Sequence, residues 1–166
     1  MRHLNFTTLL FIVMITACTK GSRNSESNVA LVENYIQAVE NSDTELMESL
    51  LAEYYIGYGP SFGDSIGKSQ ALLNWKFNVE NLYEQIHYNS SRNIAISVTT
   101  GPNQGNWVSN WAELFISYKE SQGSVTIWAN TIYLIENNKI AKSYTFYNEA
   151  DALRQLGYMI IDPNDL

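Results

Sequence analysis

The hydrophobic pattern changes at Tyr83, and this change constrains the fold more than any other feature of the chain. From there to residue 148, β-branched and aromatic residues recur at about every second position. Such a period indicates strands that bury one face, because successive side chains of a strand point to opposite sides. It predicts strands at about 84–99, 106–118, 124–136 and 139–148, joined into an antiparallel meander.

Asn137 and Asn138 separate the last two predicted strands. A two-residue hairpin turn requires positive φ at both positions, which asparagine tolerates. This turn would place three residue pairs on one face of the sheet: Asn130 opposite Thr145, Trp128 opposite Tyr147, and Ile132 opposite Ser143.

The preceding connection, near Ser121 and Gln122, leaves two registers open. A three-residue loop with a bulge would turn Glu113 toward solvent. A loop of two or four residues would instead add three pairs to the face that holds Asn130: Glu113 opposite Asn130, Trp111 opposite Ile132, and Phe115 opposite Trp128.

Amphipathic stretches precede the strands. Apolar residues spaced by three or four positions predict one helix from Val29 to Val39 and another from Leu72 to Leu82. Between them, Ser42-Asp43-Thr44-Glu45 has the pattern of a capping box, which begins a helix. The apolar residues that follow are expected to form the buried side of that helix: Leu46, Met47, Leu50 and Leu51.

The rest of the chain completes the expected architecture. The glycine-rich segment 57–67 is expected to be a loop, and a short helix at 149–156 would end at Gly157. Helices followed by an antiparallel meander predict a single α+β domain. The length of 166 residues suits one such domain.

The first 17 residues have the features of a secretory signal. Arg2 is followed by an apolar run, residues 9–15, that is shorter than the ~20 residues needed to span a bilayer. The run ends in Ile15-Thr16-Ala17-Cys18, which resembles the lipobox of bacterial lipoproteins. The resemblance implies that Cys18 is lipidated and holds the protein on the cell envelope, facing the periplasm. Residues 18–28 would then be a flexible tether, and residues 29–166 the domain.

The composition excludes several classes of partner. With 10 Lys+Arg against 17 Asp+Glu, the net charge of −7 argues against binding nucleic acid. The single cysteine excludes an internal disulfide. After residue 17, His87 is the sole histidine, and no spaced set of metal ligands accompanies it. We therefore expect neither a metal nor a cofactor.

Several short motifs occur in order along the chain: Val32-x-x-Tyr35, Asn41-Ser42-Asp43, Leu50-Leu51-Ala52-Glu53, Gly67-Lys68, Asn138-Lys139-Ile140 and Leu153-Arg154-Gln155-Leu156-Gly157. Together they resemble the nuclear-transport-factor-2-like superfamily, in particular its SnoaL-like branch. The resemblance implies a cone in which a curved antiparallel sheet wraps around N-terminal helices. It also implies an apolar pocket at the open end, with Asn130 on the concave face.

The implied site joins Glu113 and Asn130 with Tyr35 of the first helix. An apolar setting raises the pKa of a carboxyl group and suits it to acid–base chemistry. Tyr35 and Asn130 could donate hydrogen bonds to an oxyanion. In the alternative interpretation, Glu113 is hydrogen-bonded or partly exposed and the aromatic residues only form the core. The pocket-lining residues are expected to be Tyr58, Trp75, Trp111, Phe115, Trp128, Ile132, Ser143, Thr145 and Tyr147.

Three functions remain open at this level. The first is a domain that binds a small apolar or aromatic molecule without assigned catalysis, because Gly59 stands where the steroid-isomerase branch has its general base. The second is an acid–base isomerase, dehydratase or cyclase with Glu113 as base, and the third is an interaction module without ligand. The resemblance also implies a homodimer that forms through the other face of the sheet: Ala112, Leu114, Ile116, Tyr118, Ile127, Ala129 and Tyr133.

Overall fold

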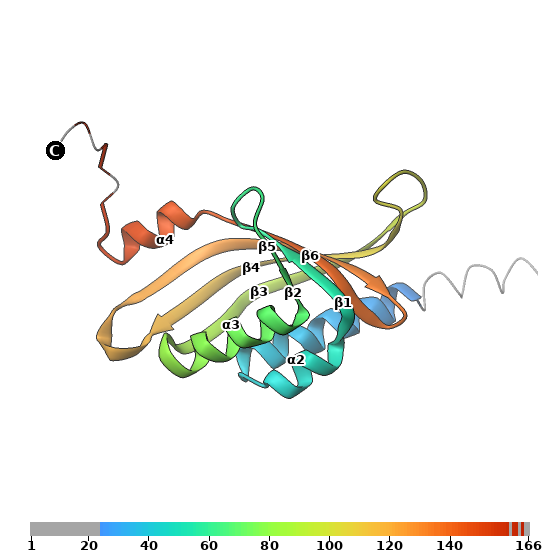
Figure 1. Ribbon diagram of the computed structural model, residues 1–166, viewed down its shortest axis with the longest axis horizontal. Helices are drawn as coiled ribbons and strands as arrows, with labels where there is room; N and C mark the ends of the chain where they lie inside the picture. Colours follow the sequence, from blue (N-terminus) through green and yellow to red (C-terminus); the bar gives the residue numbers. More distant parts are fainter. Residues whose placement is uncertain (1–23, 160, 163, 165–166) are drawn as a thin grey trace, which may run out of the picture.

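The computed structural model describes residues 24–159, 161–162 and 164 (Figure 1). The expected signal segment, residues 1–17, and the expected lipidation site, Cys18, lie outside the described residues. Within the described part, none of the helices is both long and apolar enough to cross a membrane.

One six-stranded sheet, in the order β2-β1-β6-β5-β4-β3, organises the fold. The four long strands agree closely with the prediction: β3 (Tyr83–Val98), β4 (Gly105–Tyr118), β5 (Ser124–Glu136) and β6 (Lys139–Tyr147). Two further strands, β1 (Leu51–Tyr58) and β2 (Ser65–Gly67), precede them: β2 and the end of β1 fall within the expected loop, and Leu51, expected in a helix, begins β1. β1 pairs with β6 in parallel, so the sheet is not purely antiparallel. The expected α+β class with a curved sheet is confirmed.

The N-terminal helix, described over residues 24–40, lies with α2 (Thr44–Leu50) and α3 (Lys68–Asn81) on one side of the arched sheet (Figure 1). The first helix is already formed at residue 24, within the segment expected to be a tether. Asp43, not Ser42, caps α2, because its carboxylate accepts the backbone N–H of Leu46. Leu46 itself is exposed, contrary to expectation, whereas Met47 of the same helix is buried.

The turn at Asn137 and Asn138 has the predicted geometry, with φ of 50° and 57°. A bulge between Leu134 and Ile135 then shifts the register by one residue, so that Asn130 lies opposite Phe146, not Thr145. The shift also overturns the other two expected pairs: Trp128 with Tyr147, and Ile132 with Ser143.

The register between β4 and β5 also differs from the prediction. Glu113 lies opposite Trp128, and Trp111 lies opposite Asn130. The cause is the position of the connection, because pairing ends at Ser117 and Ser124 and the loop of residues 118–123 is centred one residue earlier than expected. The β4 residues Trp111, Glu113 and Phe115 nevertheless share one face of the sheet with Asn130, as expected, because a shift of two residues does not move a side chain to the other face.

We call the helix-covered, concave side of the sheet the inner face and the opposite side the outer face. Val108 and Tyr133 of the inner face pack in one buried cluster with Val32 and Ile36 of the N-terminal helix. The expected assignment of the faces is therefore reversed for β4 and β5, whereas the β6 residues expected on the concave side, Ser143, Thr145 and Tyr147, do lie on the inner face. The β4 and β5 residues expected on the concave side lie on the outer face: Trp111, Glu113, Phe115, Trp128, Asn130 and Ile132. The residues expected at a dimer interface lie on the inner face: Ala112, Leu114, Ile116, Tyr118, Ile127, Ala129 and Tyr133.

α4 (Glu149–Gln155) follows β6, and one of its side chains attaches it to the main chain of β5 by hydrogen bonds. The Gln155 side-chain amide donates to the carbonyl of Thr126 at 2.9 Å, and its oxygen accepts the N–H of Thr126 at 2.9 Å. Asp151 accepts a further hydrogen bond from the same amide at 3.0 Å. Gly157, with φ of +87°, ends this segment as predicted.

Candidate functional site

A cavity of ≈ 370 Å³ lies between the inner face of the sheet, the helices and α4. The N-terminal helix, α3, the long strands and α4 all contribute to its walls. The cavity therefore lies at the end of the sheet next to α4. Most of the lining is aliphatic or aromatic. The lining residues are Val39, Trp75, Leu82, Tyr83, Ile86, Tyr88, Leu114, Ile116, Tyr118, Val125, Ile127, Tyr147, Glu149, Ala152, Leu153 and Leu156.

Four phenols are among the polar groups that line this mostly apolar cavity. Burial raises the pKa of Tyr83 and of Tyr88 to about 12, with smaller contributions from neighbouring phenols and, for Tyr88, from the Glu40 carboxylate. Burial also raises the pKa of Tyr118 and of Tyr147. The four hydroxyl groups therefore remain protonated at neutral pH, able to donate hydrogen bonds to a ligand.

Further tyrosines lie deeper in the core. The rings of Tyr35 and Tyr133 meet edge to face, with centroids 5.9 Å apart. Burial raises the pKa of both well above the ordinary value. Tyr35 thus points inward as expected, but it packs in the core and is not among the residues that line the cavity.

The expected trio of Glu113, Asn130 and Tyr35 is not assembled. Glu113 and Asn130 lie on the outer face, whereas Tyr35 packs against the inner face. The side-chain amide of Asn130 is held by the Ser109 hydroxyl at 3.0 Å and the Asn110 carbonyl at 2.7 Å. The assignment of Glu113 as a base in the concave pocket was therefore wrong, because it rested on the reversed faces.

Of the nine residues expected to line a pocket, Trp75 and Tyr147 do line the cavity. Ser143 and Thr145 lie on the inner face but bond to neighbours, Ser143 to Tyr55 at 2.7 Å and Thr145 to Thr131 at 3.2 Å. Tyr58 stacks on Tyr144 with centroids 4.8 Å apart. The remaining four lie on the outer face: Trp111, Phe115, Trp128 and Ile132.

Sequence reasoning missed Tyr83, Tyr88 and Tyr118 as lining residues, together with the walls contributed by α4. A signal for them was present. The inner face alternates with the outer face along β4 and β5, and from Ala112 to Ile116 its positions are apolar, whereas the outer face carries Glu113. An apolar stretch of alternating positions indicates the buried side.

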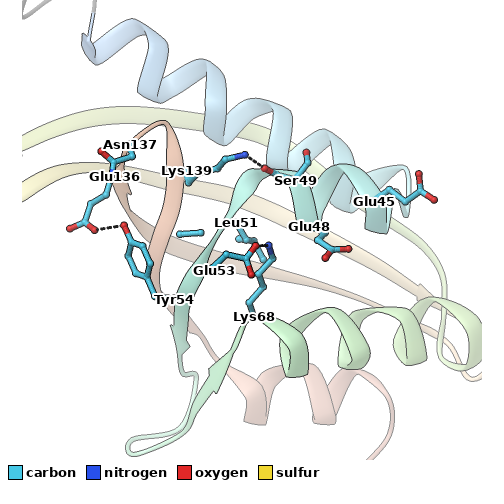
Figure 2. A pocket seen from close by; sticks show the side chains of 11 residues that line it. Glu45, Glu48, Ser49, Leu51, Glu53, Tyr54, Lys68, Glu136, Asn137 and Lys139 are labelled. Atoms are coloured by element: carbon cyan, nitrogen blue, oxygen red, sulfur yellow. Dashed lines mark hydrogen bonds and ion pairs between the residues drawn. The ribbon is translucent and has the colours of Figure 1, made fainter.

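A second hollow lies on the surface where α2 meets β1 (Figure 2). Three interactions occupy polar groups of this hollow: Lys68 with Glu53 at 2.6 Å, Tyr54 with Glu136 at 3.0 Å, and Lys139 with the carbonyl of Ser49. Within the described residues, no group of three or more His, Cys, Asp or Glu side chains is placed to hold a metal ion. The apolar cavity is therefore the better candidate site.

The outer face carries a third hollow, an open apolar groove lined by Ile96, Trp107, Tyr144 and neighbours. Large apolar side chains around it are exposed, with Trp128 at 65% and Phe146 at 54%. Exposed apolar surface of this kind is typical of a contact with another molecule.

Comparisons with known proteins show the class of fold. No protein-family profile and no curated protein sequence matches the chain. A proposed polyketide cyclase from Xanthomonas campestris pv. campestris superposes with a TM-score of 0.66 at 15% identity, covering 80% of this chain and 98% of that one. A proposed SnoaL-like polyketide cyclase from Shewanella denitrificans OS-217 gives 0.62 at 14% identity, covering 77% and 95%.

A third solved structure is a protein with a ketosteroid isomerase-like fold from Catenulispora acidiphila, in complex with trimethylamine. It superposes with a TM-score of 0.60 at 12% identity, covering 78% of this chain and 93% of that one. The chain therefore has the nuclear-transport-factor-2-like fold that these structures share. At these identities the likeness concerns the fold and not the activity.

Proposed function

We propose that the protein binds a small apolar or aromatic molecule in the cavity between the inner face and α4, without assigned catalysis. The observation that carries this proposal is the cavity itself, whose ≈ 370 Å³ lie within the range of small-molecule sites. Among its lining residues Glu149 is the one carboxylate, and this residue is exposed at the start of α4. Neighbours described as polyketide cyclases, which share this fold, support a domain that accepts a small molecule.

Filling the cavity tests this proposal. Ala152 of α4 lines the cavity, whereas Ala150 of the same helix does not. We expect Ala152→Trp to weaken binding of the neutral hydrocarbon fluorene by at least about tenfold, because the lost apolar contact is worth more than ~1.4 kcal/mol. Ala150→Trp adds the same ring outside the cavity and should leave binding unchanged. Titration by tryptophan fluorescence measures both, and equal affinities in all three proteins would contradict the proposal.

The place of action is proposed to be the cell envelope, with the protein held there by lipid on Cys18 and facing the periplasm. The apolar run of residues 9–15 followed by Ile15-Thr16-Ala17-Cys18 supports this anchor. Acyl chains on one cysteine would bind a membrane with ~0.8 kcal/mol per buried CH₂. Metabolic labelling with a fatty-acid analogue should mark the wild type and spare Cys18→Ala. Equal label in both would exclude the anchor.

A homodimer is proposed to form through the outer face, not through the inner-face residues first expected to form it. The exposed apolar side chains of Ile94, Ile96, Trp128 and Phe146 support this choice. A charge placed among them would be costly to bury. Sedimentation of Trp128→Glu should therefore show a shift from dimer to monomer.

A further inference from the structure

Aromatic residues from four elements line the cavity between the inner face and α4. Trp75 comes from α3, Tyr83 from the start of β3, Tyr118 from the end of β4 and Tyr147 from the end of β6. The fold therefore gathers around one hollow several aromatic rings that are distant in the sequence.

Neighbouring rings of this set are tilted relative to one another. The centroids of Trp75 and Tyr83 lie 6.0 Å apart with 53° between the ring planes, and those of Tyr83 and Tyr118 lie 5.5 Å apart with 72° between the planes. Tilted rings border a space on more than one side, whereas a flat stack borders it on one side. Each ring face carries the negative part of the ring quadrupole, so a cation within about 6 Å of a ring centroid is attracted to it.

The carboxylate among the lining residues adds a negative charge at the same end of the cavity. Glu149 lines the cavity from α4, where it is exposed to solvent. Its charge contributes to the raised pKa of Tyr147, which shows that this carboxylate and this phenol lie near each other. A cation at this end of the cavity would therefore have both an aromatic ring and a counter-charge beside it.

No positive charge opposes such a cation among the described residues that line the cavity, because they include no lysine, arginine or histidine. Two basic side chains of adjoining elements are engaged elsewhere. Lys119 donates to the carbonyls of Val79 and Glu80, each at 2.8 Å, and Arg154 donates to a carbonyl of its own helix at 3.1 Å.

The other walls define the rest of the ligand. They are largely aliphatic, with Val39, Ile86 and Val125 among their residues, and they suit an apolar group. A quaternary ammonium group fits the aromatic end better than a primary amine, because it has no N–H donors that need acceptors and recognition of such groups by aromatic residues is a common use of cation–π attraction.

We infer that the cavity binds organic cations that carry a quaternary ammonium group, which lies among the aromatic rings beside Glu149 while the apolar part of the ligand packs against the aliphatic walls. The inference rests on the proposed function, because it requires that a ligand occupies the cavity. It adds the charge of that ligand, which cavity size and apolarity alone do not define.

Two ligands of matched shape test the inference. Phenyltrimethylammonium and tert-butylbenzene differ in that a positively charged nitrogen replaces a neutral carbon. We expect Glu149→Gln to weaken binding of phenyltrimethylammonium about two- to fivefold, the effect of losing one partly exposed counter-charge, and to leave binding of tert-butylbenzene unchanged. Asp151→Asn is the control, because it makes the same change of charge on α4 at a residue that does not line the cavity, and it should alter neither affinity.

A second pair of variants tests the aromatic rings. Tyr147→Leu removes a ring from the cavity and keeps an apolar side chain, so it should lower the affinity for the cation about two- to fivefold more than the affinity for tert-butylbenzene. Phe146→Leu removes the neighbouring ring, which is exposed on the outer face, and should leave the ratio of the two affinities as in the wild type.

A third readout needs the wild-type protein alone. The N-methyl proton resonances of phenyltrimethylammonium should move upfield when the protein is added, because these protons lie over aromatic ring faces. This measurement holds whether or not Tyr147→Leu folds.

The outcomes separate the two proposals. If tert-butylbenzene binds the wild type and phenyltrimethylammonium does not, or if the ratio of their affinities is the same in the wild type, Glu149→Gln and Tyr147→Leu, the inference is overturned and the proposed function stands. If neither these ligands nor fluorene bind the wild type, the proposed function and this inference fail together.

Discussion

The two faces of β5 differ in what surrounds them, although both are rich in large apolar side chains. Tyr133 on the inner face is 4% exposed and packs against Tyr35 of the N-terminal helix. Trp128, five positions earlier and on the outer face, is 65% exposed. The same strand therefore builds the core and cavity on one side, and on the other it carries an uncovered apolar surface around Trp128 although Leu134 farther along is buried.

This difference shows that the size of an apolar side chain does not indicate which face of such a sheet it lies on. Tryptophan and phenylalanine gather on the outer face, while the inner face is built from smaller aliphatic residues and from tyrosines. The aliphatic residues leave room for the helices and the cavity. The large outer residues are available for contacts between molecules.

The largest predicted effect is the difference in the free energy of unfolding between substitutions at Tyr133 and at Trp128. Tyr133→Ala should lower the free energy of unfolding by about 3–5 kcal/mol, because it leaves a hole in a well-packed core. Trp128→Ala should change it by no more than about 0.5 kcal/mol at protein concentrations where the chain is monomeric, because a largely exposed side chain loses few contacts. Urea unfolding measures both, and equal losses would show that the two faces are not packed differently.

A smaller effect is predicted at high pH. Tyr88 has a pKa of about 12 in the folded protein, against an ordinary value of 10.0, because it is buried beside Glu40 and Tyr83. Below pH 10 the phenol is protonated in both states, so it adds no pH dependence. Between pH 10 and about 12 the unfolded state loses the proton first, and stability should fall by about 2–3 kcal/mol for this group.

Tyr88→Phe is the reference for that measurement, because it keeps the ring and removes the ionisable group. The difference in unfolding free energy between the wild type and Tyr88→Phe should change by this amount from pH 9.5 to pH 12. In a pH titration of the folded protein, the phenolate absorbance of Tyr88 should appear at a higher pH than that of an ordinary tyrosine, because its pKa is raised. A difference between the two proteins that is independent of pH would mean that the Tyr88 phenol titrates alike in both states.

The sequence was sufficient to predict most of the helices and strands and the fold class. The alternation along β4, β5 and β6 gave their boundaries within about two residues, and Asn137-Asn138 defined the turn. These features are local, since they depend on side-chain period and on the φ that a residue tolerates.

The site could not be predicted in the same way. The bulge near Leu134 and the long connection after Ser117 both shift the register, and neither has a local signature in the residues around it. The choice of concave face rested on the resemblance alone, although the aliphatic run Leu114, Ile116, Ile127 indicates the buried side. Trp75 was found because its helical spacing places it toward the sheet, independently of strand register.

The attachment of α4 has a consequence for how this protein can diversify. Gln155 recognises the main chain of Thr126, and every residue except proline offers the same N–H and C=O groups. The helix that lines the cavity is thus held in a way that does not depend on the side chain at position 126. Substitutions on the outer face at this position can therefore accumulate in descendants of this sequence while α4 stays in place.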